Sequence, residues 1–290
     1  MNELKWAVLG TGVIANEMAQ ALHNMGRTLY GVCNRTNDKA VSFAKKYHVE
    51  KVYTSYNEMY EDSSVDVIYI TTPHNTHYEF IRQSLLHGKH VLAEKSITLN
   101  SSELNKLKAL ADEKASILLM NPSEAMTIWH MPLSKKLWQI VESGQIGRPQ
   151  MITMNFGSFK DYDMTNRFFN ISLAGGAMLD IGVYALSIVR SFMCESPDQI
   201  LSQMKPAPTG CDEQASILLM NPSGQMATKQ TIIEAGRTSN ALQYELEDME
   251  TAILTGNTAI MKLRESSDVM DIMTKLRSDW GLFYPEEIHS

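Results

Sequence analysis

Cysteine is scarce in this chain, and so are long runs of one charge or of apolar residues. The three cysteines, Cys33, Cys194 and Cys211, are odd in number and widely spaced, which argues against a disulfide framework or a zinc site. The net charge is −7 without a basic stripe, so we expect no nucleic-acid partner. No apolar run reaches the length that a bilayer requires, and the start of the chain is polar. We therefore expect no membrane partner, no signal peptide and a cytoplasmic location.

The composition fits two modest globular domains. The 290 residues are 44% apolar and 20% charged, which is ordinary for a protein with a substantial core. The 19 methionines form no ligand pattern, so we interpret them as core filling and expect no metal. A change of pattern near residue 124 predicts a division into residues 1–123 and 124–290.

Strand-like and helix-like segments alternate through the first domain. Short apolar runs are expected to be buried strands, and segments with helical spacing follow them. The predicted strands are residues 5–9, 29–33, 52–53, 65–71, 89–93 and 117–120; the predicted helices are residues 14–25, 38–47, 56–60, 77–87 and 101–114. This alternation predicts an α/β fold with a doubly wound parallel sheet.

The second domain has a different pattern, because its strands follow one another without crossover helices. The predicted strands are residues 150–159, 200–205 and 214–220; the predicted helices are residues 133–143, 176–191, 241–254 and 268–279. We expect an α+β domain with an open, mostly antiparallel sheet.

The segment ASILLMNPS occurs twice, at residues 115–123 and 215–223. A perfect repeat of this length does not arise by chance, and a single copy does not make a repeat architecture. Both copies are predicted strands. The Asn-Pro-Ser ending suits a turn at the second site, so we interpret the first copy as the derived one.

A glycine-rich turn follows the first predicted strand and opens the first predicted helix. Its G-x-G-x-x-A pattern is typical of a Rossmann dinucleotide site, in which the glycines admit the pyrophosphate at the helix N-terminus. As a lone motif it would equally serve packing, and its position in the β/α series favours binding. The candidate cofactor residues here are Gly10, Thr11, Gly12, Val13 and Ile14.

The second strand ends with Asn34 and Arg35, where an NAD site usually has a carboxylate. A carboxylate would repel a 2′-phosphate, whereas a guanidinium attracts it with paired donors. We therefore expect NADP, with NAD as the less favoured cofactor. The alternative is that Arg35 is an ordinary solvated surface residue.

Two further groups of residues follow predicted strands at the same sheet edge, where such folds bind ligands. The loop after residues 65–71 contributes the cofactor candidates Thr72, Pro73, Asn75 and His77, although a lone histidine there is more often structural. The next strand ends in Glu94 and Lys95, which we predict to contact the cofactor. Lys95 is also a catalytic candidate, and a surface salt bridge is the alternative.

The third group lies in the second domain, where two glycines precede a predicted helix. Asp180 and Tyr184 are spaced to share one face of that helix, although each would serve equally well as a structural residue.

Together and in this order, G-T-G-V-I-A, T-T-P-H-N-T-H, E-K and G-G-A-M-L-D-I-G-V-Y resemble the Gfo/Idh/MocA oxidoreductases over nearly the whole chain. In this resemblance Lys95 corresponds to the catalytic lysine of the E-K-P motif, with Ser96 in place of the proline. Asp180 and Tyr184 match the D-x-G-x-[HY] pattern, and the tyrosine resembles the glucose–fructose oxidoreductase and dihydrodiol dehydrogenase branches. The second domain is shorter than the family pattern, so the resemblance implies a short sheet. Such a sheet would leave apolar residues such as Leu218 uncovered and make this domain the less stable one.

The resemblance implies hydride transfer between NAD(P) and a sugar, polyol or dihydrodiol-type alcohol. It also implies a C-terminal sheet that often forms the oligomer contact, which allows a homodimer through that sheet. The alternative function is a non-catalytic NADP-binding sensor or regulator on the same fold.

Overall fold

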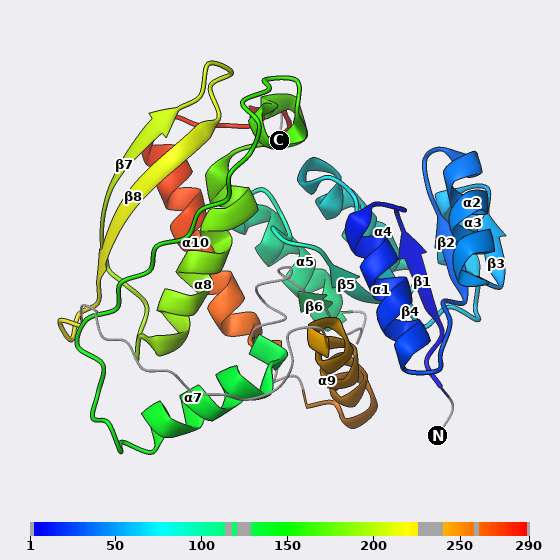
Figure 1. Cartoon of the computed structure of the whole chain (residues 1–290), viewed down its shortest axis with the longest axis horizontal. Coiled ribbons are helices and arrows are strands. Elements are labelled where there is room, and N and C mark those ends of the chain that lie inside the picture. The colour runs from blue at the N-terminus through cyan, green and yellow to red at the C-terminus, as the bar shows by residue number, and fades with distance from the viewer. Residues whose placement is uncertain (1–2, 114–117, 121–128, 226–239, 258–260, 289–290) are drawn as a thin grey trace. The chain divides into compact units, whose positions relative to one another are not determined.

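We describe a computed structural model of the chain, which covers residues 3–113, 118–120, 129–225, 240–257 and 261–288. It forms two compact units (Figure 1). The first unit comprises Met1–Thr98, Ser102–Thr127 and Thr238–Leu263. The second comprises Leu99–Ser101, Ile128–Arg237 and Arg264–Ser290.

The first unit contains a six-stranded parallel sheet with the order β3-β2-β1-β4-β5-β6, which confirms the predicted doubly wound fold. Its strands are β1 (Trp6–Leu9), β2 (Gly31–Cys33), β3 (Lys51–Tyr53), β4 (Val67–Ile70), β5 (His90–Ala93) and β6 (Leu118–Met120). The strands β1, β2, β4 and β5 are fully buried or nearly so, as expected for a sheet covered on both faces.

The register aligns the carboxyl ends of the central strands. Leu9 pairs with Cys33 on one side and with Ile70 on the other, and Ile70 pairs with Ala93. The chain order reverses between β1 and β4, which is where open α/β sheets bind ligands. The glycine turn, the Asn34–Arg35 pair, the loop after β4 and the Glu94–Lys95 pair therefore all leave the sheet at this edge.

The helices of the first unit connect consecutive strands, as the sequence predicted. They are α1 (Val13–Asn24), α2 (Asn37–Tyr47), α3 (Tyr56–Glu61), the short η1 (His74–Thr76), α4 (His77–Leu86) and α5 (Ser101–Glu113). The buried face of α1, with Met18 and Leu22, packs in the same core cluster as Trp6 and Val8 of β1.

A later helix, α9 (Ala241–Thr255), also belongs to the first unit. Its apolar side chains, including Met249, join the core cluster, and Glu250 accepts hydrogen bonds from the Trp6 indole (2.8 Å) and the Arg27 guanidinium (2.7 Å). The sequence-based division at residue 123 assigned this helix to the second domain. The helix belongs to the first unit instead, because its apolar face packs in that core and Glu250 binds Trp6 on β1 and Arg27 just after α1.

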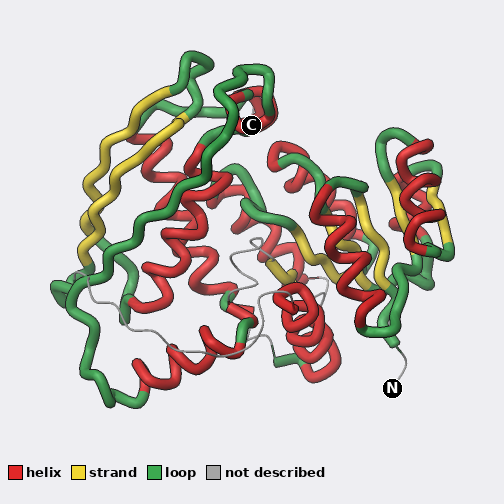
Figure 2. The backbone as a smooth tube through the Cα atoms, in the orientation of Figure 1, coloured by secondary structure: helices red, strands yellow, loops and turns green. Residues whose placement is uncertain are grey.

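The second unit combines helices with one antiparallel hairpin. Its elements are α7 (Pro132–Glu142), the short turns η2 (Arg167–Phe169) and η3 (Ile171–Leu173), the π-helical η4 (Met178–Gly182), α8 (Val183–Phe192), β7 (Gln199–Pro206), β8 (Asp212–Met220), α10 (Leu263–Asp279) and α11 (Pro285–Ile288). Figure 2 shows β7 and β8 as one long two-stranded ribbon. Leu201 and Leu218 on this hairpin are 69% and 51% exposed, in agreement with the short sheet that we predicted.

The predicted strand over residues 150–159 is wrong. In the described part of the chain this segment has a single bridge residue, Ile152, and Figure 2 draws most of it as loop. Alternating apolar residues form a strand only where a neighbouring strand satisfies their backbone groups. The sheet of the second unit has only β7 and β8 among the described residues, so no such neighbour is present there.

The two copies of the repeated segment confirm that its Leu-Leu-Met core suits a strand. Leu118–Met120 forms the parallel strand β6, and the same letters end the antiparallel strand β8. The neighbouring chain, more than the local sequence, therefore decides which kind of sheet these residues join.

One stretch, Ile171–Phe192, is apolar and long enough to cross a membrane by length and composition, and an 18-residue window within it has a mean hydropathy of 1.6. Our sequence-based expectation overlooked it because Asp180 and Arg190 interrupt the apolar residues. Arg190 is buried and ion-paired with Asp268 at 2.7 Å. This pairing and the burial of most of the stretch are typical of a core helix.

Candidate functional site

The glycine turn has a backbone that only glycine accommodates. Gly10 has a φ of +112°, and a Cβ there would lie 2.4 Å from Oγ1 of Thr71. Its amide donates to the Cys33 carbonyl at 2.8 Å, which fixes the turn after β1 against the end of the neighbouring strand β2. Gly10 therefore shapes the turn and lets β4 approach it closely.

Gly12 serves a different purpose, because a Cβ there would meet no atom within 4 Å. It precedes α1 without a side-chain cap, and the next residue, Val13, is 72% exposed. Asn16 donates to the carbonyls of Thr11 and Gly12, which orients the turn. Open space in front of uncapped helix amides, with Ile14 half-buried in the first turn, fits the pyrophosphate of a dinucleotide.

Arg35 at the tip of β2 is exposed and makes no hydrogen bond or ion pair with any residue that the structure describes. Its neighbour Asn34 donates from Nδ2 to the Thr36 carbonyl at 3.0 Å, which leaves its amide oxygen for another partner. A free guanidinium beside a strand tip that lacks a carboxylate fits the 2′-phosphate of NADP.

The loop after β4 is held by its own hydroxyl groups. The Thr76 hydroxyl lies 2.7 Å from both Thr72 Oγ1 and the Pro73 carbonyl. Pro73 is exposed and Thr72 half-buried, so both lie where a ligand at this edge can reach them. Asn75 is half-buried in the same turn, within η1.

His77, predicted to contact the cofactor, is fully buried at the start of α4. Its Nδ1 lies 2.9 Å from the Ser96 carbonyl, and its Nε2 lies 2.7 Å from the Thr72 carbonyl. Burial lowers the pKa of His77, so the neutral ring donates to one of the two oxygens. Its role here is to connect the loop after β4 with the chain just after Lys95.

Glu94 and Lys95 directly follow β5. Glu94 is buried and accepts a hydrogen bond from the hydroxyl of Tyr69 on the neighbouring strand β4. Burial, followed by the charge of Glu94, raises the pKa of Tyr69 well above its usual value, so this phenol remains the donor. Lys95 is half-buried, and its peptide bond to Ser96 is cis.

Asp180 and Tyr184 are both buried, in the second unit, on η4 and on the first turn of α8. Asp180 Oδ1 lies 3.5 Å from an Arg167 nitrogen. The Tyr184 ring packs on Phe156, with 5.3 Å between the ring centroids. Sequence reasoning missed Arg167 and Phe156, because no helix or strand spacing connects them to Asp180 and Tyr184.

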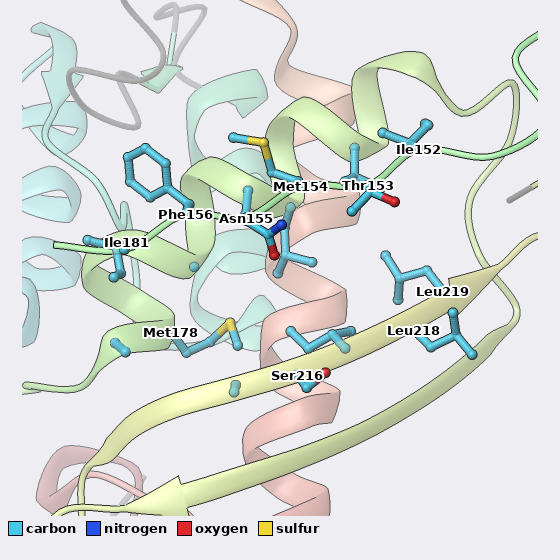
Figure 3. Close-up of a pocket in the computed structure, with 18 of the residues that line it drawn as sticks. Ile152, Thr153, Met154, Asn155, Phe156, Met178, Ile181, Ser216, Leu218 and Leu219 are labelled. Atoms are coloured by element: carbon cyan, nitrogen blue, oxygen red, sulfur yellow. The ribbon is translucent and has the colours of Figure 1, made fainter. Parts of the chain in front are cut away.

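The second unit contains a cavity of about 640 Å³, shown in Figure 3. Its lining comes from the extended residues 151–158, one face of η4 and α8, and β8. Most lining side chains are apolar, among them Ile181 and Leu219, and neither Asp180 nor Tyr184 is one of them. Phe156 both lines the cavity and packs on Tyr184, so its ring connects the cavity lining with Tyr184.

A metal centre finds no support in the described residues, since none of their His, Cys, Asp and Glu side chains form a group of three or more that could hold an ion.

Comparisons with known proteins agree with this geometry. Residues 4–121 match the model described as "Oxidoreductase family, NAD-binding Rossmann fold", and residues 134–247 match the "GFO/IDH/MocA C-terminal domain". A trans-1,2-dihydrobenzene-1,2-diol dehydrogenase from Xenopus laevis is 31% identical over 333 residues, covering 97% of this chain and 99% of the relative. This alignment is longer than the chain itself, so the relative carries segments that have no counterpart here.

The corresponding mouse enzyme is 30% identical over 227 residues, covering 76% of this chain and only 66% of the relative, slightly less than two thirds of its length. Among solved structures, a 3-ketoreductase from Actinomadura kijaniata in complex with NADP and TDP-benzene has a TM-score of 0.78 at 19% identity. It covers 96% of this chain and 98% of that one. At this identity the likeness shows the fold alone. The two family matches and the full-length relative show that the chain belongs to the Gfo/Idh/MocA family of NAD(P)-binding oxidoreductases.

Proposed function

We propose that this protein is an NADP-dependent dehydrogenase or reductase that transfers a hydride between the cofactor and an alcohol or carbonyl carbon. The observation that carries the proposal is the position of Lys95. It follows β5 at the same sheet edge as the open Gly12 turn, and its neighbour Glu94 is buried and held by Tyr69.

The choice of NADP over NAD rests on Arg35. Its guanidinium is exposed and makes no hydrogen bond or ion pair among the described residues, and no carboxylate follows β2 directly. A phosphate on the ribose would gain a charge-assisted contact there, which the hydroxyl of NAD lacks.

The nicotinamide, when bound, gives or accepts the hydride. The chain must then move a proton at the substrate oxygen as the carbonyl forms or is reduced. A free phenol has a pKa near 10 and is a poor base at neutral pH, whereas a neighbouring positive charge lowers that pKa. We assign proton transfer to Lys95 and Tyr184, with either group in contact with the substrate oxygen.

Asp180 completes the proposed set, either by orienting Lys95 or by binding a substrate hydroxyl. The carboxylate lies 3.5 Å from an Arg167 nitrogen, and its oxygens could accept hydrogen bonds in both roles. Sugars, polyols and trans-dihydrodiols are the substrate classes. A trans-dihydrodiol comes first, because the 31% identical relative is named for one.

The test is NADP⁺ reduction, followed by NADPH absorbance, against a panel of sugars, polyols and trans-dihydrodiols. We expect turnover of at least one alcohol by the unmodified protein. Tight NADPH binding without turnover of any panel member would favour the alternative, a non-catalytic NADP-binding sensor. Failure to bind either dinucleotide would contradict both functions.

A further inference from the structure

A buried carboxylate from the hairpin reaches the start of the helix that carries Asp180 and Tyr184. Asp212, at the first position of β8, is only 1% exposed. Its Oδ2 accepts a hydrogen bond from the amide of Met178, the first residue of η4. The amide of Ala177 also donates toward it. Asp212 therefore caps this helix from a distant part of the chain, where a negative charge also interacts favourably with the helix dipole.

The backbone beside Asp212 is shaped to let it approach. Gly176 has a φ of +132°, and a Cβ there would lie 2.2 Å from Asp212 Oδ1. The Tyr284 hydroxyl, which lies 3.5 Å from the same Cβ position, donates to the Gly175 carbonyl at 3.0 Å and also holds this turn. The two glycines thus have separate packing reasons in this unit. Gly176 lets a side chain from β8 reach the helix amides, whereas a Cβ at Gly175 would collide with the backbone of Arg167 and Asn170.

Several titratable or charged groups act on Asp212 or on its neighbours. The Arg277 guanidinium of α10 lowers its pKa, and Arg277 in turn pairs with Glu287 of α11 at 2.8 Å and lies over the ring of Tyr284. Cys211 precedes Asp212 and is also buried. Asp180 lies two residues beyond Met178 on the capped helix, with Arg167 beside it.

We propose that Asp212 is a positioning residue for Asp180 and Tyr184, because its ionised carboxylate fixes the start of the helix on which both stand. The expected effect on kcat rests on the proposed function. The expected effect on the start of the helix rests on the capping contact alone. In this role Asp212 acts through the Met178 amide and not through a contact with substrate or cofactor.

Burial raises the pKa of Asp212 to about 6, with the two helix amides and Arg277 acting in the opposite direction. The carboxylate is therefore ionised at neutral pH and takes up a proton in mildly acidic solution. A protonated carboxyl is the weaker acceptor, so the start of the helix should loosen as the pH falls through this value.

The experiment compares Asp212→Asn with Asp268→Asn. Asp268 of α10 pairs with Arg190 in the last turn of α8, so the control removes a carboxylate that contacts the opposite end of the same helix. For each protein we would measure hydrogen exchange over residues 177–184, NADPH binding, and kcat and KM for the substrate as functions of pH.

We expect Asp212→Asn to bind NADPH normally and to exchange faster over residues 177–184. Its kcat should fall about tenfold, as expected for the loss of one charge-assisted cap. The acid limb near pH 6 in the kcat profile of the unmodified protein should disappear in this variant and remain in Asp268→Asn. Equal kcat losses with the same acid limb in both variants would overturn the positioning role.

The two proposals can fail separately. If the unmodified protein turns over no alcohol, the proposed function fails, and exchange over residues 177–184 still tests the capping contact. Unchanged protection there in Asp212→Asn would overturn it. If Asp212→Asn does not fold, the same exchange is followed in the unmodified protein between pH 5 and 8, after correction for intrinsic rates. Protection that does not fall with acid would then overturn the inference.

Discussion

Tyr69 on β4 donates its hydroxyl hydrogen to the carboxylate of Glu94, the residue that directly precedes Lys95. Both side chains are buried, and their strands are paired through Ile70 and Ala93. The contact thus anchors the end of β5 at the point where the chain presents its candidate catalytic lysine.

Replacing Tyr69 by Phe should destabilise the first unit. The change leaves the buried Glu94 carboxylate without this donor, and we expect the free energy of unfolding to fall by about 1–3 kcal/mol. Chemical denaturation measures this directly. Tyr60→Phe is the matched control, since the buried Tyr60 hydroxyl has no hydrogen-bond partner among the described residues. Equal losses in the two variants would show that the Tyr69–Glu94 contact contributes nothing specific.

Replacing Arg35 by Ala should narrow the preference for NADPH over NADH. Losing a charge-assisted contact to the 2′-phosphate should weaken NADPH binding about tenfold or more, with little change for NADH. Dissociation constants for both dinucleotides measure the effect. Arg82→Ala removes a half-buried arginine of α4, whose nitrogen lies 3.5 Å from Glu79, and should leave both constants unchanged. Equal affinities for both cofactors in the unmodified protein would contradict the assignment of Arg35.

Lys95→Ala should abolish turnover while NADPH binding stays largely intact. The reason is that the proposed role of Lys95 is proton transfer, whereas the open Gly12 turn and Arg35 are proposed to bind the phosphates. Steady-state kinetics with a fluorescence titration of NADPH separate the two effects. Near-normal turnover by this variant would show that another group moves the proton.

Tyr184→Phe should lower kcat and change its pH profile, because the phenol hydrogen and its pKa are lost while the ring still packs on Phe156. Because the ring is retained, we expect the variant to stay folded, and an unchanged melting curve would show that a lower rate does not come from unfolding. An unaltered pH profile would remove Tyr184 from the proton path.

The second unit should open more readily than the first. We expect hydrogen exchange to be faster across residues 215–233 than across residues 7–12 and 65–71, although residues 226–233 lie outside the described part of the chain. The reason is that β8 pairs only with β7 among the described strands, and Leu201 and Leu218 remain exposed on the hairpin. Uniform protection in a dilute, monomeric sample would contradict this expectation.

The order of strands and main helices along residues 5–120 could be predicted, with each end within two residues of the observed one. Runs such as Val67–Ile70 are continuously apolar and fully buried, and glycine marks the turn after β1. The positions of the glycine turn, Arg35 and Lys95 at one sheet edge follow from that order alone. These are local signals, read within a few residues of each strand.

Contacts between distant parts of the chain could not be predicted. Nothing in the spacing of residues indicates that Glu250 accepts from Trp6, or that Asp212 caps the helix at Met178. The predicted strand at residues 150–159 failed for the same reason, because a strand depends on a neighbour elsewhere in the sequence. These pairings form because buried polar groups need hydrogen-bond partners and apolar side chains need burial, and both depend on the whole unit.

Because α9 belongs to the first unit, this nucleotide-binding unit is built from segments that are not continuous in the sequence. A fragment ending at residue 123 would lack Glu250, leave Trp6 and Arg27 without their shared acceptor, and uncover the apolar surface that Met249 fills. Such a fragment should not fold as a free-standing module. Exchange of cofactor modules between relatives by simple end-to-end recombination is therefore disfavoured, and the two units are expected to be inherited together.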